Sequence, residues 1–401
     1  MSPRRVLALA QLANSIGDGA YLVTSALYFA RIIGLTPTQI GFGLTLGWAV
    51  GALAGIPIGR LADRHGPRGV AVLLAVTTAT AVASFVLVRS FAVFVLVACL
   101  YGTAQTGLSA VRQALLAGLI EPAKRTEVRA VLQATLNGGL AVGAALGGLA
   151  LHLDTREAYL TLFLLDAAGF LAAALALLRL PAVPAVPSRR RLAVLRDRPY
   201  ALVTLINTVM LFYMPLLSLV VPLWIAQRTS VPTWLVSVLL VINTAGVLLF
   251  QVRVARRVQG LPDASRSVRH AGLVMLAACM VFALSATGSS AWLAAAVLLI
   301  AMALQVLGEM LQAAGAWEIS FALAPDDKHG EYQGFFGTSV AMARMLGPVV
   351  LTTVVMGWGA AGWLVVGAGF LVAGLAMAPA VRWAERSRTR TDTSAQPASP
   401  E

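Results

Sequence analysis

Long apolar windows separated by short polar loops run along the whole chain. Most are long enough to supply the roughly 20 apolar residues that a helix needs to cross a bilayer. The composition, 59% hydrophobic and only 12% charged, lies well outside that of soluble domains. The windows fall at about 7–30, 38–60, 69–88, 92–118, 129–152, 158–179, 200–226, 233–254, 269–287, 290–318, 332–357 and 360–384. The sequence therefore predicts an all-α polytopic membrane protein with twelve transmembrane helices.

A polar segment divides the windows into two groups of six. Residues 181–199 are rich in Pro and Arg, are too polar to insert into a bilayer, and indicate a linker. They separate a first bundle over 1–180 from a second bundle over 200–384. The last segment, 385–401, is rich in Arg, Ser and Thr and is expected to be a disordered tail.

The two halves resemble each other at a nearly constant offset. A shift of 195 places Gly51 on Gly246, and a shift of 193 places Asn14 on Asn207. Together with the six spans in each half, this offset indicates an internal duplication, as in many secondary transporters. We therefore expect two pseudo-symmetric six-helix bundles.

The basic residues gather in alternate loops. If the N-terminus is cytoplasmic, 24 of the 30 Lys and Arg residues lie in the inside segments. Two more lie within spans, and the outside loops hold Arg31, Arg89, Arg156 and Arg228. Because cytoplasmic loops are enriched in basic residues, the count places both termini and the linker in the cytoplasm. Membrane orientation thus explains the net charge of +13, and no nucleic-acid partner is expected.

The ten residues from Gly59 to Arg68, Gly-Arg-Leu-Ala-Asp-Arg-His-Gly-Pro-Arg, place a dense polar patch between the second and third spans. Gly59 allows a close backbone approach, and Gly66 allows a positive φ. Asp63 lies among arginines that include Arg64 and Arg68, within reach of charge-assisted pairing. The segment is therefore predicted to be a tight cytoplasmic turn.

This turn resembles the signature loop between helices 2 and 3 of the major facilitator superfamily of transporters. The family pattern is Gly-x-Leu-Ala-Asp-Arg-x-Gly followed by two basic residues, and Leu61 and Ala62 complete the match. Pro67 departs from the pattern where a first basic residue is usual. The resemblance implies the fold of that superfamily, with two six-helix bundles around a central cavity, and transport by alternating access.

The corresponding segment of the second half, Val254–Gly260, keeps its basic residues but lacks the Asp. This asymmetry indicates that the first turn has a role that the second has lost. We expect Asp63 and its arginines to latch the two bundles in the outward-open state by pairing with the ends of neighbouring helices. The turn would then be a gating element and not a substrate site.

Span 5 carries glycines at the spacing of the superfamily's antiporter motif, Gly-x-x-x-Gly-Pro-x-x-Gly-Gly. They are Gly139, Gly143, Gly147 and Gly148, and Ala144 stands in place of the Pro. Such spacing gives one helix face a smooth groove against which another backbone packs closely. A helix-packing seam is therefore expected. The resemblance also favours export over import, although the loss of the Pro removes the expected kink.

Ionisable residues inside spans are costly and indicate function. Asp18 lies at the middle of span 1 among small residues, in Asn14-Ser-Ile-Gly-Asp-Gly. One interpretation is that Asp18 and Asn14 bind substrate or protons, and the other is that Asp18 is a structural residue. Glu309 in span 10 and Asp166 in span 6 are the next acids. Because spans 1, 4, 7 and 10 line the cavity in the superfamily, the resemblance favours Glu309 over Asp166.

Two arginines also lie within spans, Arg112 in span 4 and Arg344 in span 11. Each is a candidate counter-ion for an acid or a ligand for an anionic substrate group. For Arg112 the alternative is an interfacial side chain that extends to the membrane surface. Asn207 and Tyr213 in span 7 are further candidates for the cavity lining, although such side chains also fill helix interfaces.

Signals of soluble enzymes are absent from the sequence. It contains no Gly-Lys-Ser/Thr phosphate loop and no dinucleotide fingerprint after a strand. The two Cys and four His residues have no spacing that would build a metal site. We therefore expect a transporter that is not an enzyme and needs no cofactor or metal. The resemblance to the superfamily and the acids within the spans imply that the proton gradient is its driving force.

Two transport functions are consistent with the sequence. The first is proton-coupled efflux of an apolar or cationic small organic compound, as in drug:proton antiporters, by a monomeric multi-pass protein of the cell membrane. The alternative is an importer or facilitator of a small polar or anionic metabolite, in which Arg112 and Arg344 hold the substrate. A scaffold or sensor without transport is disfavoured because the charges within the spans are retained.

Overall fold

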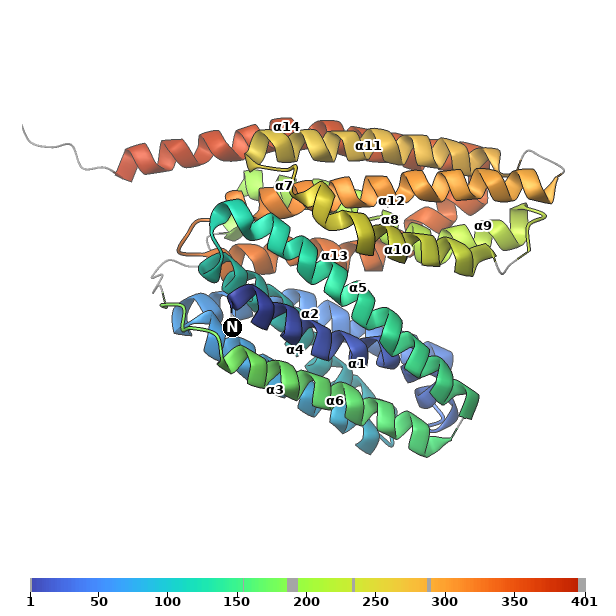
Figure 1. Ribbon diagram of the computed structural model, residues 1–401, viewed down its shortest axis with the longest axis horizontal. Coiled ribbons are helices and arrows are strands. Elements are labelled where there is room, and N and C mark those ends of the chain that lie inside the picture. The colour runs from blue at the N-terminus through green and yellow to red at the C-terminus, as the bar shows by residue number, and fades with distance from the viewer. Residues whose placement is uncertain (1, 154, 186–193, 233–234, 287–289, 396–401) are drawn as a thin grey trace, which may run out of the picture. The chain divides into compact units, whose positions relative to one another are not determined.

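The computed structural model describes residues 2–153, 155–185, 194–232, 235–286 and 290–395, and every regular element in these ranges is a helix (Figure 1). Twelve helices in this part of the chain are long and apolar enough to cross a membrane. The predicted all-α architecture with twelve spans is thereby confirmed.

The helices follow the predicted windows closely. Six come from the first half of the chain: α1 (Pro3–Arg31), α2 (Pro37–His65), α3 (Pro67–Ser84), α4 (Phe91–Leu119), α5 (Pro122–Leu153) and α6 (Arg156–Leu178). The second half contributes α7 (Arg198–Met210), α8 (Tyr213–Pro215), α9 (Val221–Arg228), α10 (Leu235–Ala255), α11 (Gly260–Leu284), α12 (Ala291–Ala322), α13 (His329–Leu351) and α14 (Ala360–Ala395). Two short 3-10 turns are present: Phe85–Leu87 ends the third span, and Val194–Arg196 precedes α7.

The seventh span is broken, whereas the sequence predicts one continuous window. Pro215 lacks the N–H that would continue the helix ladder, and the residues after it form a π-helical turn at Leu216–Val220. The pieces α7, α8 and α9 therefore make up one span together. The break places Tyr213 at an irregular point in this span.

Capping signals explain where several spans begin. In α2 the Thr36 hydroxyl accepts from the backbone N–H of Gln39 at 3.2 Å, and the Gln39 side chain accepts from the backbone N–H of Thr36 at 2.9 Å. Pro67 occupies the start of α3, where its missing N–H costs no hydrogen bond. Such short, capped connections reverse the chain direction between consecutive helices, while the most extensive packing includes pairs further apart in the sequence, such as α1 with α5 and α2 with α4.

The chain divides into two compact units. Unit 1 comprises Met1–Leu192 together with Ala324–Ala341, and unit 2 comprises Ala193–Leu323 together with Met342–Glu401. The first part of α13 thus groups with the first half of the chain, although the sequence predicts it in the second bundle. A polar contact with α2, described below, accounts for this difference.

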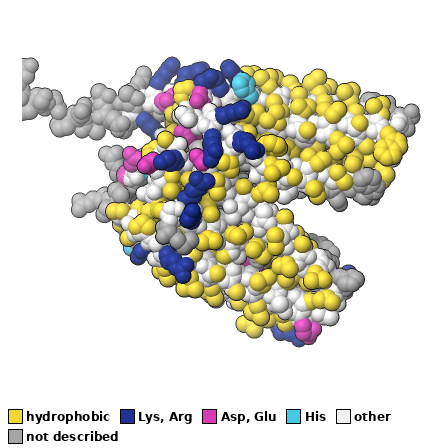
Figure 2. All heavy atoms as spheres, in the orientation of Figure 1, with side chains coloured by type: hydrophobic (Ala, Val, Ile, Leu, Met, Phe, Trp, Pro, Cys, Tyr) yellow, Lys and Arg dark blue, Asp and Glu magenta, His cyan; other side chains and the backbone are white. Residues whose placement is uncertain are grey.

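Aromatic side chains fill the core of unit 1 where α1, α4 and α6 meet. The rings of Tyr28 and Phe163 pack edge-on with their centroids 4.8 Å apart, and the ring centroids of Phe29 and Phe94 are 4.7 Å apart. Unit 2 has a smaller aromatic core made of Trp224, Phe282 and Trp363. Hydrophobic side chains cover the sides of the helices, and Lys and Arg side chains gather at helix ends (Figure 2).

The last helix continues past the point where the sequence predicts a disordered tail. α14 runs to Ala395, so 385–395 extends the twelfth span as helix. The segment contains no Gly or Pro before Pro397, and Arg388 pairs with Asp197 at 3.7 Å. The rest of the predicted tail, 396–401, and the linker residues 186–193 lie outside the described residues.

Candidate functional site

The turn between α2 and α3 has the geometry that the sequence predicts. Gly66 adopts a φ of 88°, in the left-handed region that favours glycine. Arg68 donates from Nη1 to the backbone carbonyl of Leu180 at 2.8 Å, which fastens the turn to the end of α6. The turn is therefore anchored inside unit 1.

Asp63 caps the first turn of α13. One carboxylate oxygen accepts from the backbone N–H of Gly330 at 2.8 Å, and the other accepts from that of Glu331 at 2.9 Å. The first N–H groups of a helix have no partner within the helix, and its N-terminus favours negative charge. Asp63 thus satisfies two such donors with a charged acceptor.

Glycines allow α2 and α13 to come close enough for this contact. A Cβ on Gly59 would collide with the backbone of Gly330, and a Cβ on Gly334 would collide with the carbonyl of Gly55. The close approach predicted for Gly59 is therefore confirmed, and its partner is the start of α13. This contact explains why 324–341 groups with unit 1.

Asp18 lies half-buried on α1 and accepts hydrogen bonds from two neutral amides. Asn14, one turn earlier on the same helix, donates to one oxygen at 3.0 Å, and Gln105 of α4 donates to the other at 3.0 Å. Gln105 also donates to the hydroxyl of Tyr101 at 3.3 Å. The sequence predicts Asn14 and Asp18 as candidates, but it did not assign Gln105 to this site.

Among the described residues, Arg112 has no direct hydrogen bond to Asp18, and Asn14 links the two side chains. Its Nη2 donates to the side-chain oxygen of Asn14 at 3.0 Å, and its Nη1 donates to that of Gln11 at 3.3 Å. The guanidinium is therefore held by amide oxygens of α1 within unit 1. The sequence does not predict a role for Gln11. It lies one turn before Asn14 on α1, close to the predicted start of the first span.

The glycines of α5 face α1 directly behind this network. A Cβ on Gly139 would collide with Ser15, and a Cβ on Gly143 would collide with the carbonyl of Ile16. A Cβ on Gly147 would meet Val23 at 3.1 Å, whereas a Cβ on Gly148 would meet no other helix within 4 Å in the described part of the chain. Three of the four motif glycines therefore form the expected packing seam, and Gly148 lies outside it.

Unit 2 holds its own carboxylate. Glu309 of α12 is half-buried and accepts from the side-chain amide of Asn243 on α10 at 2.7 Å. One turn earlier on α12, the amide of Gln305 is fully buried and has no hydrogen-bond partner among the described residues. Tyr213 is buried on α8, and Arg344 is exposed on α13.

A second polar contact in unit 2 repeats the one around Asn14. Gln312 of α12 donates to the side-chain oxygen of Asn207 on α7 at 2.8 Å. Asn207 corresponds to Asn14 at a shift of 193, and Gln312 corresponds to Arg112 at a shift of 200. The same pair of helices in each half is thus joined by the same type of contact, with a charge in unit 1 and a neutral amide in unit 2.

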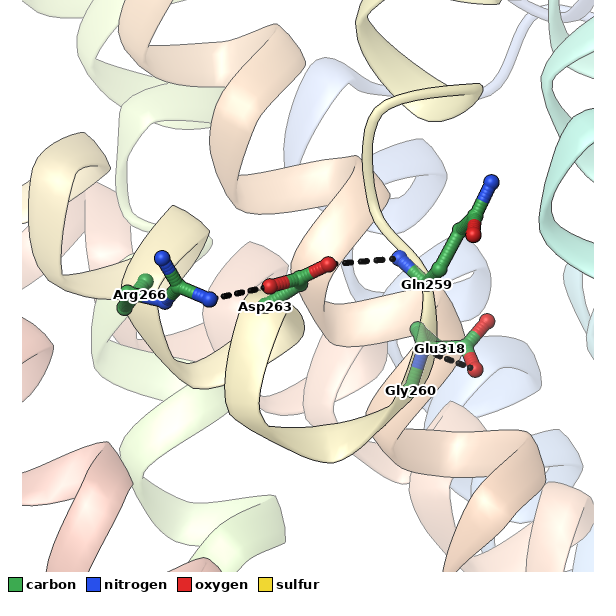
Figure 3. Close-up of polar contacts among 5 residues, drawn as sticks. All are labelled: Gln259, Gly260, Asp263, Arg266 and Glu318. Carbon is green, nitrogen blue, oxygen red and sulfur yellow. Dashed lines mark hydrogen bonds and ion pairs between the residues drawn. The ribbon is translucent and has the colours of Figure 1, made fainter.

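The turn between α10 and α11 is the repeat of the turn at Gly66. Gly260 adopts a φ of 79°, and its backbone N–H donates to Glu318 at the end of α12 at 3.1 Å. Asp263 accepts from the backbone N–H of Gln259 at 3.4 Å and pairs with Arg266 (Figure 3). This second turn is therefore tied within unit 2, and Glu318 serves as its anchor.

Asp166 is the remaining acid that the sequence singles out. It lies on α6, is fully buried, and neither of its carboxyl oxygens has a hydrogen-bond partner among the described residues. A Cβ on Gly17 of α1 would collide with its Cα and with a carboxyl oxygen. Asp166 therefore packs against the backbone directly before Asp18.

No cluster of three or more His, Cys, Asp and Glu residues suited to a metal ion lies in the described ranges. The model of the Major Facilitator Superfamily matches residues 7–348. The chain belongs to the major facilitator superfamily. It is therefore a multi-pass membrane transporter and not an enzyme, as the sequence predicts, and its fold supports secondary transport of a small molecule. No curated protein sequence matches this superfamily member.

Solved structures agree with this assignment at the level of the fold. The human organic anion transporter MFSD10 (TETRAN) is 19% identical, with a TM-score of 0.66 over 96% of this chain and 99% of that one. A bacterial homologue of the iron transporter ferroportin is 14% identical, with a TM-score of 0.77 over 96% and 100%. The Escherichia coli fucose:proton symporter FucP is 12% identical, with a TM-score of 0.75 over 95% and 98%.

Proposed function

We propose that this transporter exports an apolar or cationic small organic compound across the cell membrane in exchange for protons, by alternating access. The observation that carries the proposal is the set of partners around Asp18. Its carboxylate lies within a span and is held by the neutral amides of Asn14 and Gln105. A carboxylate with neutral donors keeps its charge available for an organic cation or a proton.

The arrangement of Arg112 supports this role for Asp18. The guanidinium binds the oxygens of Asn14 and Gln11, so it stabilises the network without closing a direct ion pair with the acid. A direct pair would compete with both substrate and proton for the carboxylate. Glu309, which accepts from Asn243, is the corresponding candidate acid in unit 2.

Asp18→Asn tests the proposal directly. The variant keeps the shape of the side chain, so it should fold, but it can carry neither the negative charge nor a titrating proton. In vesicles with an acidic interior, the wild-type protein should accumulate ethidium, a permanently charged organic cation, and Asp18→Asn should not. Glu157→Gln, which removes an exposed acid on α6, is the matched control and should transport normally. Unchanged accumulation by Asp18→Asn would remove Asp18 from the mechanism.

The alternative is an importer or facilitator of a small polar or anionic metabolite. The observation in its favour is that the guanidinium of Arg112 hydrogen-bonds to the neutral oxygens of Asn14 and Gln11 and not directly to a carboxylate, which leaves it able to bind an anionic substrate group. The solved relatives are an organic anion transporter, a bacterial homologue of an iron transporter and a fucose:proton symporter, so they do not select between the two. The direction of flux in vesicles with an imposed pH gradient distinguishes them.

We also propose that Asp63 is a gating latch. The support is its double hydrogen bond to the first turn of α13, a helix that begins in unit 1 and continues into unit 2 past Ala341. Breaking this contact would free the start of α13 to move. Asp63 would then hold the transporter in the outward-open state, with the arginines of the turn supporting it.

A further inference from the structure

The most unusual buried group in unit 1 is the carboxyl of Asp166. It is 0% exposed, and neither oxygen has a hydrogen-bond partner among the described residues. By contrast, the Asp18 carboxyl receives a donor on each oxygen. The two acids therefore have opposite surroundings although they lie on helices that pack together.

An ionised carboxylate is costly within a membrane unless donors or a counter-ion surround it. In the described part of the chain, no element packed against α6 provides Asp166 with a hydrogen bond or an ion pair. On α1 the ionisable groups at this level are Asp18, which would repel a second negative charge, and Tyr21, whose ring packs edge-on against Phe163 at 5.6 Å. α3 has only Arg68, which donates to Leu180 just past the end of α6. The Lys, Arg and Glu residues of α5 lie within its first eight residues. α4 contributes the Tyr101 hydroxyl, which accepts from Gln105.

The contact with Gly17 brings Asp166 next to the Asp18 network. Gly17 directly precedes Asp18, and any side chain at position 17 would collide with Asp166. Asp166 therefore contacts the backbone next to Asp18, so the two acids lie close together. A change of charge on one of them acts on the other across this short distance.

From this geometry we propose that Asp166 carries a proton as a neutral carboxylic acid and is the proton-binding group of the exchange. Asp18 is the anionic group. This assignment rests on the proposed proton-coupled function and divides its two tasks between two acids. During the cycle the Asp166 O–H gives its proton to water on one side of the membrane, which leaves a carboxylate. The carboxylate takes a proton from water on the other side.

Infrared spectroscopy tests the protonation state without transport. The carbonyl stretching band of protonated carboxyl groups should be present in the wild-type protein and lose intensity in Asp166→Asn. It should persist in Asp18→Asn and in the control Glu157→Gln. A hydrophobic carbodiimide, which modifies protonated carboxyls in apolar surroundings, should label the wild-type peptide that contains Asp166, so the test does not depend on the variant's folding. An unchanged band together with an unlabelled peptide would overturn the proposal.

Transport then tests the role of this proton. Asp166→Asn should still exchange external for internal ethidium, which moves no net proton, but an imposed pH gradient should no longer drive accumulation above the level of protein-free vesicles. Gradient-driven accumulation that survives in Asp166→Asn would also overturn the proposal. If the wild-type protein itself ignored the gradient, the proposed proton-coupled function would fail, and the infrared and labelling results would still decide whether Asp166 is protonated.

Discussion

Asn14 connects Arg112 to Asp18 in unit 1. It donates to Asp18 and accepts from Arg112, so one neutral side chain carries a hydrogen bond to each ionised group. Its repeat counterpart, Asn207, accepts from the neutral Gln312. The duplicated position therefore has different electrostatic surroundings in the two units.

This difference predicts that replacing the Asn by Ala lowers the stability of the protein by different amounts in the two units. Asn14→Ala should destabilise the protein by about 2–3 kcal/mol, because hydrogen bonds to charged groups are the stronger ones and their partners are left unsatisfied. Asn207→Ala should cost only about 1 kcal/mol, the usual value for a neutral pair. Thermal or denaturant unfolding in detergent measures both. Equal costs, or a larger cost for Asn207→Ala, would contradict the account of this contact.

The sequence predicts several site residues individually but not how they connect. Asp18 and Asn14 are recognisable because a polar pair four residues apart lies on one face of an apolar helix. Gln105 and Gln11 carry no charge and match no motif, so their roles depend on which helices meet. A shift of 200, which aligns Gln105 with Gln305 and Arg112 with Gln312, marks the position of Gln105, whereas it aligns Gln11 with Leu211 and gives no signal there.

At the scale of the helices, small residues determine how closely α1 and α5 pack. Gly139, Gly143 and Gly147 lie four residues apart and contact α1, whereas Gly148 lies on another face. In a membrane such close packing replaces the hydrophobic effect as the source of helix association. Gly148 is part of the antiporter-like motif but does not contact α1. Packing of this seam therefore does not explain why a glycine stands at position 148.

The seam predicts opposite results at two neighbouring glycines. Gly143→Ala should destabilise the protein by about 1–3 kcal/mol, the usual cost of overpacking, because the new Cβ meets the backbone of α1. Gly148→Ala should be neutral or stabilising by roughly 1 kcal/mol, because Ala favours the helix and nothing lies nearby. Unfolding in detergent measures the difference. A destabilised Gly148→Ala, or a Gly143→Ala as stable as the wild type, would show that the seam is wrong.

The contact of Asp63 with α13 yields a test of gating. Asp63→Asn removes the charge and one of the two acceptors at the start of α13, so it should weaken the cap by about 1 kcal/mol. Transport should slow, and the distance between spin labels placed one on each unit should change its distribution. Asp263→Asn, which alters the second turn within unit 2, is the control and should do neither. If Asp63→Asn had the transport rate and the distance distribution of the wild type, the gating role would be wrong, and the turn would only be a topological anchor.

The boundaries of the helices show which features of the fold hydropathy alone predicts. The twelve windows match the helices because each is set by an apolar run between polar loops. The break after Pro215 and the continuation of α14 to Ala395 were not predicted. Hydropathy measures how readily a segment inserts, whereas these features depend on a missing N–H and on helix-forming residues beyond the membrane.

At the scale of the whole molecule, duplication supplies two bundles and sequence divergence gives them different tasks. Unit 1 keeps the half-buried Arg112, the acids of α1 and α6 and the Asp63 cap. Unit 2 keeps the corresponding turn but ties it to its own Glu318. The fold followed from the sequence because apolar length and the signature turn are local signals. The compound transported did not, because it depends on surfaces contributed by many helices.

Coupling between proton and substrate is the central claim, and it is tested most directly by following protons during substrate movement. Vesicles that contain the protein and a trapped pH-sensitive dye are given an ethidium gradient, with no pH gradient and with the membrane potential clamped by potassium and valinomycin. The account predicts that protons move opposite to ethidium in the wild type and do not move in Asp18→Asn. Protons that move with ethidium, or ethidium that moves without protons in the wild type, would contradict it.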